Sequence, residues 1–191
     1  MSASDNSMTN KPPYILGLTG GLASGKSTVS GFFKEAGATI VDADAIVHQL
    51  QAAGTPETQT IAEHISQNTG NNILDETGAI DRQKLAKQIS ANSELLTFLE
   101  GVLHPAVHRE EKKQIKVAAE AGKTLVVLDV PLLFEAGSDK HCDSVALCDA
   151  PQEVRKQRAM ARGGMTEEKW QALHARRWPD EKAKAAADYI I

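Results

Sequence analysis

Short apolar segments alternate with longer amphipathic ones along most of this chain. Helical spacing starts near Gly25 and ends around Gly37, and further helices are predicted after Pro151 and after Thr166, a residue suited to cap one. Continuous apolar runs rich in β-branched residues predict buried strands at 14–19, 38–41, 124–130, 144–148 and 188–191. Apolar strands that alternate with helices favour an α/β fold with a doubly wound, mostly parallel sheet.

The stretch between the second and third predicted strands has a different pattern. It shows helical periodicity without a convincing strand, and turn residues interrupt it at 54–56, 68–72 and 77–78. We expect a helix boundary at His104-Pro105, because proline disfavours helical backbone in the residue before it. The stretch is too long for a single crossover connection, so we predict a separate helical subdomain.

One glycine-rich turn carries a specific chemical signal. GGLASGKST follows the first predicted strand, opens the first predicted helix and matches G-x-x-x-x-G-K-[ST] in full. In such a loop the backbone amides face phosphate oxygens, the lysine reaches the β- and γ-phosphates, and the following hydroxyl binds Mg²⁺. The sequence therefore predicts a nucleotide site with Mg²⁺ on Ser27 and phosphates on Gly20, Ala23, Ser24, Gly25, Lys26, Ser27 and Thr28.

A phosphate-binding loop alone does not separate kinases from other nucleotide-binding proteins. The chain lacks the Asn-Lys-x-Asp segment with which GTPases bind guanine, and it lacks the Leu-Ser-Gly-Gly signature of transporter ATPases. A small-molecule kinase needs a carboxylate near the acceptor hydroxyl, a segment that binds the acceptor, and cations that close over the phosphates. Each of these three requirements has a candidate in the sequence.

The carboxylate candidates follow predicted strands. Asp42 and Asp44 come at the carboxyl end of the second strand, where ligands bind in open α/β sheets, and one of them could accept a proton. The alternative is that these residues only cap the next helix. Asp129 ends the run LVVLD and is expected to hold Mg²⁺ or its water ligands.

The cationic candidates lie in the predicted helix after Pro151. Arg155, Arg158 and Arg162 are three and four residues apart, so we expect them to share one exposed helix face that ATP phosphates visit. A solvated basic face is the alternative. The glycines at 163–164 would supply a hinge for a closing lid.

Composition excludes several other classes of protein. The 191 residues carry a formal net charge of −4 and are 4% aromatic, which disfavours a nucleic-acid partner. No apolar run is long enough to cross a bilayer, and the polar segment 1–13 has no signal-peptide core. Two cysteines without metal-site spacing indicate no disulfide framework, so we expect a soluble, cytoplasmic protein.

Five separated motifs, in order, resemble the dephospho-coenzyme A kinase family. They are GLTGGLASGKSTV, VDADAIVH, LHPAV, LDVPLLFEAG, and a basic helix followed by RRWPDEKAKAAADYII. The resemblance covers nearly the whole chain, from about residue 15 to residue 191. It implies a P-loop kinase fold that uses ATP and Mg²⁺ to phosphorylate the ribose 3′-hydroxyl of dephospho-coenzyme A.

The resemblance also implies roles for parts of the chain. A core at about 13–44, 123–150 and 186–191 would carry the phosphate-binding loop, a helical subdomain at about 45–122 would bind the acceptor, and a lid would occupy about 151–185. Asp44 is implied as the general base, with Asp42 as support or metal contact. The residues implied to bind the acceptor are Arg82 and His104, and those implied in the lid are Arg158 and Arg162.

The chain departs from the family pattern at two places that concern the nucleotide. Ala23 stands where glycine is commoner, which the backbone tolerates only if this residue avoids positive φ. Arg177-Trp178 replaces a Gln-apolar pair. Two alternative functions remain open at this point: a nucleoside or nucleotide kinase of similar build, and a non-catalytic nucleotide-binding regulator. The sequence does not predict the oligomeric state.

Overall fold

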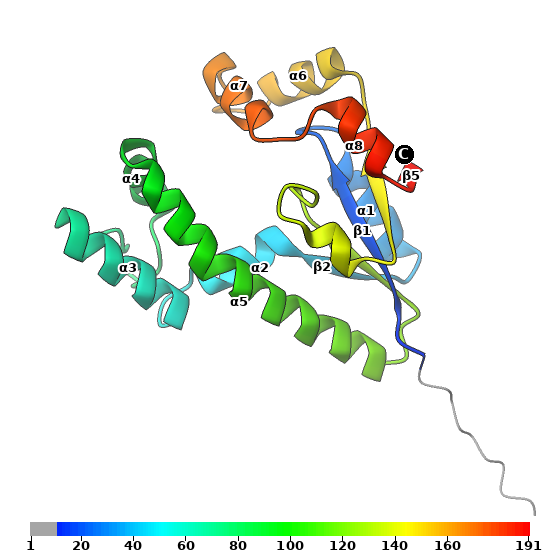
Figure 1. The fold of residues 1–191 in the computed structure, drawn as a ribbon, viewed down its shortest axis with the longest axis horizontal. Helices are drawn as coiled ribbons and strands as arrows, with labels where there is room; N and C mark the ends of the chain where they lie inside the picture. The colour runs from blue at the N-terminus through cyan, green and yellow to red at the C-terminus, as the bar shows by residue number, and fades with distance from the viewer. Residues whose placement is uncertain (1–10) are drawn as a thin grey trace, which may run out of the picture. The chain divides into compact units, whose positions relative to one another are not determined.

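The computed structural model describes residues 11–191 as two compact units, 11–42 with 114–191 and 43–113 (Figure 1). The polar amino-terminal segment predicted at 1–13 lies almost entirely outside the described residues. The elements are β1 (Tyr14–Gly20), α1 (Lys26–Glu35), β2 (Thr39–Asp42), α2 (Ala43–Leu50), α3 (Pro56–Thr69), α4 (Arg82–Ala91), α5 (Ser93–Glu120), β3 (Leu125–Asp129), the 3₁₀ turn η1 (Ser138–His141), β4 (Ser144–Cys148), α6 (Gln152–Met160), α7 (Glu167–Ala175), α8 (Asp180–Ala186) and β5 (Tyr189–Ile190).

The first unit is built on a five-stranded sheet in the order β2-β3-β1-β4-β5, with every pair parallel. Each predicted strand is present, and the predicted α/β class is confirmed. Central strands β3 and β4 are buried almost throughout because helices and loops leave neither face to solvent. All five strands end at one edge of the sheet, which is the edge where ligands bind in folds of this kind.

The apolar core of this unit joins the sheet to the first helix. Leu18 of β1 and Val127 of β3 are fully buried in one apolar cluster. Val29 and Phe33 of α1 pack against this cluster. A second cluster joins the glycine-rich loop to α6 and α7 through Ala23, Ala159 and Trp170. The loop is therefore packed against these two helices.

The second unit has a core of its own. Buried leucine and isoleucine side chains from α3, α4 and α5 pack together around Ile61, Ile65 and Leu99. Local signals set the helix ends: the Thr55 hydroxyl accepts from the Thr58 amide at 3.1 Å, and Gly70 ends α3 with a φ of 69°. The predicted helical character of this stretch is confirmed. Among its described residues, extended backbone pairs at one isolated antiparallel bridge, between Leu74 and Ile80.

The predicted helix boundary at His104-Pro105 is wrong. Helix α5 runs without interruption from Ser93 to Glu120, with Pro105 inside it. A proline in a helix loses one backbone hydrogen bond and crowds the carbonyl four residues earlier. That residue is Gly101, whose missing side chain lets the backbone adjust, and both positions are exposed. In the part of the chain that the structure describes, no helix is both long and apolar enough to cross a membrane.

Candidate nucleotide-binding site

The glycine-rich loop connects the end of β1 directly to the first turn of α1. The Ser24 amide donates to the Gly21 carbonyl at 3.0 Å, and the Thr28 amide donates to the Gly25 carbonyl at 2.9 Å. Gly25 precedes the helix with φ 105° and ψ 8°, a conformation that side chains with a Cβ rarely adopt. The free amides of the first helical turn and the positive end of the helix dipole therefore point at the same place, and this favours an anion there.

Ala23 adopts the conformation that the sequence argued against. Its φ is 60°, and it is the one residue other than glycine with positive φ among those described. Left-handed backbone costs a non-glycine residue about 1–2 kcal/mol. The methyl group of Ala23 offsets part of that cost because it is buried against Ala159 and Trp170. The loop therefore tolerates alanine here through packing and not through a relaxed backbone.

The loop lysine has a carboxylate partner within the first unit. Lys26 Nζ forms an ion pair with Asp129 Oδ1, from the carboxyl end of β3, and Asp129 is 5% exposed. Strand pairing places Asp129 opposite Leu18 of β1 and Asp42 of β2, so the fold itself brings these positions to one edge. The sequence predicts Lys26 at the phosphates and Asp129 at their Mg²⁺, and this ion pair is consistent with both side chains serving one site. Their direct contact was not predicted.

The oxygen-bearing side chains of the loop suit both phosphate and a hard cation. The Ser24 hydroxyl is buried and has no hydrogen-bond partner among the described residues, so the loop holds a polar group that the chain does not satisfy. Ser27 is exposed in the first turn of α1. Its hydroxyl and the carboxylate of Asp129 are the hard oxygen donors that Mg²⁺ prefers.

The carboxylates proposed for proton transfer divide between the two units. Asp42 is the exposed last residue of β2 and belongs to the unit that contains the loop. Asp44 is an exposed residue in the first turn of α2, in the second unit. Both side chains engage in interactions within the chain.

The two predicted acceptor-binding residues also lie in the second unit. Arg82 is the first residue of α4 and contacts His48 Nδ1 of α2 through its guanidinium group. His104 is exposed on α5. Their proposed contact with an acceptor stays a prediction.

The three predicted lid arginines do not share one exposed face, and this expectation is corrected. Arg158 is exposed, but Arg155 is 1% exposed and lies under the glycine-rich loop. Helix α6 ends at Met160, so Arg162 follows the helix, and its amide donates to the Ala159 carbonyl at 3.0 Å. The error has a physical cause: Arg155 lies in the first turn of α6, where its guanidinium group binds the Ala150 carbonyl and Asp180 and lies against Gly21, and spacing alone does not report burial.

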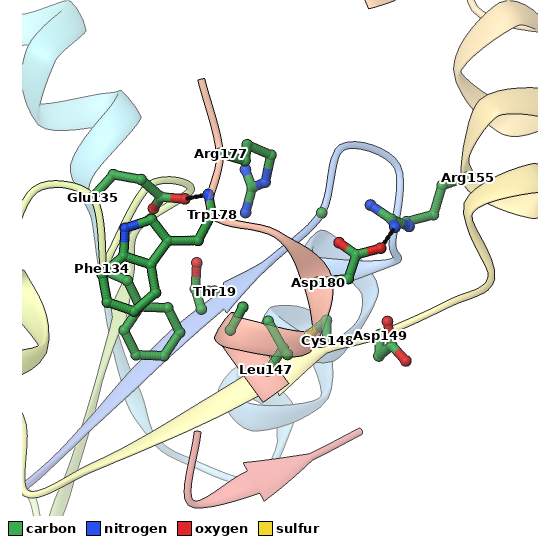
Figure 2. Close-up of a pocket in the computed structure, with 12 residues that line it drawn as sticks. Thr19, Phe134, Glu135, Leu147, Cys148, Asp149, Arg155, Arg177, Trp178 and Asp180 are labelled. Carbon is green, nitrogen blue, oxygen red and sulfur yellow. Dashed lines mark hydrogen bonds and ion pairs between the residues drawn. The ribbon is translucent and has the colours of Figure 1, made fainter. Parts of the chain in front are cut away.

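A polar pocket beside the loop brings together Arg177 and Trp178, which the sequence singled out, with Glu135 and Asp180, which it did not (Figure 2). Burial lowers the pKa of Arg177, the nearby charge of Arg155 lowers it further, and the carboxylates of Glu135 and Asp180 oppose both effects. The Trp178 amide donates to Glu135 at 2.6 Å. Helix α8, which supplies Asp180, was also not predicted, although the segment RRWPDEK showed closely spaced opposite charges.

Aromatic stacking closes one side of this pocket. The rings of Trp178 and Phe134 stack with centroids 5.2 Å apart, and Lys182 Nζ lies 3.4 Å from the Trp178 ring centroid. Cys148 also lines the pocket, and burial raises the pKa of its thiol to about 11. A thiol with that pKa stays protonated near neutral pH, so this cysteine is not a nucleophile.

Taken together, the parallel sheet, the complete phosphate-binding loop and the Lys26–Asp129 pair define a P-loop enzyme of the kinase class. A family model described as dephospho-CoA kinase matches residues 14–191. The chain therefore belongs to the dephospho-CoA kinase family, and the resemblance noted from its motifs is confirmed.

Individual relatives agree with the family. The chain is 42% identical over 177 residues to a dephospho-CoA kinase from Bartonella quintana, covering 93% of this chain and 87% of the relative. It is 43% identical to one from Symbiobacterium thermophilum, covering 93% and 72%. Among solved structures, a Thermus thermophilus protein aligns with a TM-score of 0.78 at 31% identity, covering 94% of this chain and 88% of that one. A dephospho-CoA kinase from Campylobacter jejuni aligns with a TM-score of 0.70 at 26% identity, covering 93% and 86%.

Proposed function

We propose that this chain transfers the γ-phosphoryl group of ATP to the ribose 3′-hydroxyl of dephospho-coenzyme A, which gives coenzyme A and ADP. The observation that carries the proposal is a complete phosphate-binding loop in a chain whose family match runs over residues 14–191. The reaction is the last step of coenzyme A biosynthesis. We expect it to take place in the cytoplasm, which cell fractionation would test.

The first unit binds the phosphates of ATP. Amides of the loop between Gly20 and Thr28 hold the phosphate oxygens, and Lys26 places a cation on the transferring group. Asp129 orients Lys26 through their ion pair. Ser27 and Asp129 would hold Mg²⁺, which supplies charge neutralisation on the β- and γ-phosphates when bound.

The second unit supplies the general base Asp44 and the side chains that bind the acceptor, whereas Asp42, Arg158 and Arg162 belong to the first unit. Asp44 takes the proton of the attacking 3′-hydroxyl, and Asp42 supports it. Arg82 and His104 bind dephospho-coenzyme A. Arg158 and Arg162 stabilise the negative charge of the transition state from the lid, because guanidinium groups bind phosphate oxygens in pairs.

An ADP-release assay over a small panel of acceptors tests the proposal. The panel holds dephospho-coenzyme A, AMP, uridine and shikimate, each at the same concentration with ATP and Mg²⁺. We expect turnover with dephospho-coenzyme A alone. Turnover with AMP or uridine in its place would indicate a nucleotide or nucleoside kinase, and no turnover with any acceptor would favour a nucleotide-binding regulator.

A further inference from the structure

Arg155 is the largest fully buried side chain among the described residues of this chain, and the reaction proposed above gives it no role. Its Nε donates to the Ala150 carbonyl at 2.8 Å, and its Nη2 is paired with Asp180 Oδ2 at the start of α8. A buried arginine keeps its charge, so this side chain must keep its partners. Figure 2 shows the guanidinium group facing Asp180 beside the loop.

The same guanidinium lies directly against the glycine-rich loop. A Cβ built on Gly21 would lie 2.1 Å from Arg155 Nη1 and 2.9 Å from Cζ. Gly21 does not have positive φ, so close approach and not backbone conformation requires a glycine here. The Gly21 carbonyl accepts from the Ser24 amide, so a shift at Gly21 moves the phosphate-binding turn.

Arg155 also fixes the helix from which the lid begins. It lies one turn before Arg158 on α6, and Ala159 on the same helix packs against Ala23 of the loop. The close approach of Arg155 to Gly21 and the apolar contact of Ala159 with Ala23 therefore both join α6 to the loop within the first unit.

We propose that Arg155 is a positioning residue: paired with Asp180, it holds the Gly21 corner of the phosphate-binding loop and the base of α6 in one arrangement. Arg155 acts on ATP through the loop backbone and does not contact the phosphates itself. The part of the test that measures turnover rests on the function proposed above. ATP affinity measured without an acceptor tests it separately.

The main experiment measures the ATP dissociation constant by calorimetry and the KM of each substrate for Arg155→Met, Arg155→Lys and Asp180→Asn. We expect Arg155→Met to weaken ATP binding and to raise the ATP KM at least about tenfold, because the loop amides lose the arrangement that preorganises them for the phosphates. The KM for the acceptor should stay within about twofold of wild type. Arg155→Lys should recover part of the affinity, because lysine keeps the charge but reaches fewer partners.

Lys156→Met is the matched control. Lys156 is the next residue on α6, and its ion pair with Glu167 is exposed on both sides. Exposed pairs contribute little, so we expect ATP affinity within about twofold of wild type. An Arg155→Met variant that binds ATP as tightly as this control would overturn the proposal, as would equal increases in the KM of both substrates.

Paired variants keep the proposal testable if Arg155→Met fails to fold. Asp180→Asn leaves a buried guanidinium without its carboxylate, whereas Arg155→Met leaves a carboxylate whose side chain is 37% exposed and can be hydrated. We therefore expect the double variant Arg155→Met/Asp180→Asn to be more stable than Asp180→Asn alone. We also expect Gly21→Ala to weaken ATP binding less in an Arg155→Ala background than in wild type. Additive effects of Gly21→Ala and Arg155→Ala on ATP binding would show that Arg155 does not act through the loop and would overturn the proposal. Additive effects of the Arg155 and Asp180 substitutions on stability would show that the two side chains are not coupled.

Discussion

The two units of this chain hold their candidate residues in different ways. In the first unit, Lys26 and Arg155 are each paired with a carboxylate, and the loop between β1 and α1 is packed against α6 and α7. In the second unit, which has an apolar core of its own, Asp44 on α2 and His104 on α5 are exposed.

We expect this difference to separate nucleotide binding from binding and deprotonation of the acceptor. The groups proposed to bind ATP are held in place by the fold of one unit, so we expect nucleotide affinity to depend on that unit alone. The groups proposed to bind and deprotonate the acceptor belong to the other unit. Substitutions there should lower kcat or raise the acceptor KM while ATP affinity stays constant.

The strongest test of this separation is Asp44→Asn, which keeps the shape of the side chain and removes its basicity. We expect kcat to fall by about 10²–10⁴, as for a lost general base, with ATP affinity within about twofold of wild type. Asp42→Asn is the matched control and should lower kcat less. Steady-state kinetics and calorimetry on both variants check this, and a reversed order would assign the base to Asp42.

Lys26→Ala should affect the first unit instead. We expect kcat to fall by about 10²–10³, because the transferring phosphoryl group loses a fixed cation. Circular dichroism should report an unchanged fold. Lys34→Ala, an exposed lysine in the last turn of the same helix, is the control with wild-type activity. A Lys26→Ala variant that keeps more than about a tenth of wild-type kcat would count against the assignment of the loop.

Arg158→Ala and Arg162→Ala are expected to lower kcat at least about a hundredfold each, because arginines that bind the transition state contribute strongly in phosphoryl transfer. Arg176→Ala, an exposed arginine at the end of α7, serves as the control. Measurements of kcat and ATP affinity for all three variants test whether Arg158 and Arg162 act on the phosphates from the lid. Equal, small effects would mean that these arginines only face solvent.

The smallest effect is expected at Ala23. Replacement by glycine relieves about 1–2 kcal/mol of left-handed strain. It also removes a buried methyl group worth about 0.8 kcal/mol and raises the conformational entropy of the unfolded chain, and both of these effects destabilise the fold. We expect the free energy of unfolding in urea to change by less than about 1 kcal/mol. Ala23→Val should destabilise by more, because a β-branched residue fits positive φ poorly. An Ala23→Val variant as stable as wild type would contradict the claim that the backbone is strained at this position.

The fold was predictable because its signals are local. Buried strands such as 144–148 and the cap at Thr166 follow from short-range pattern, and the structure contains both. The burial of Arg155 was not predictable, because its partner Asp180 lies 25 residues away on a helix that the sequence did not indicate. Spacing placed Arg155 near its neighbours along the helix but could not report what the sheet edge covers.

Compensation by other residues explains the remaining differences, locally at Pro105 and through distant contacts at Ala23. Pro105 inside α5 is tolerated where Gly101 precedes it by one turn, and Ala23 at positive φ is tolerated where Trp170 covers its methyl group. Neither contact is visible as a motif. The site residues carried by the phosphate-binding loop follow from its motif, whereas the roles of Asp44, Arg82 and His104 rest on family resemblance and stay predictions.

The position of the transferred phosphate tests the central claim most directly. The purified protein is incubated with ATP, Mg²⁺ and dephospho-coenzyme A, and ³¹P NMR of the product identifies the ester that forms. The account predicts a new monoester resonance on the ribose 3′-oxygen, in proportion to the ADP released. Release of inorganic phosphate without a new ester, or phosphorylation of a different hydroxyl, would contradict it.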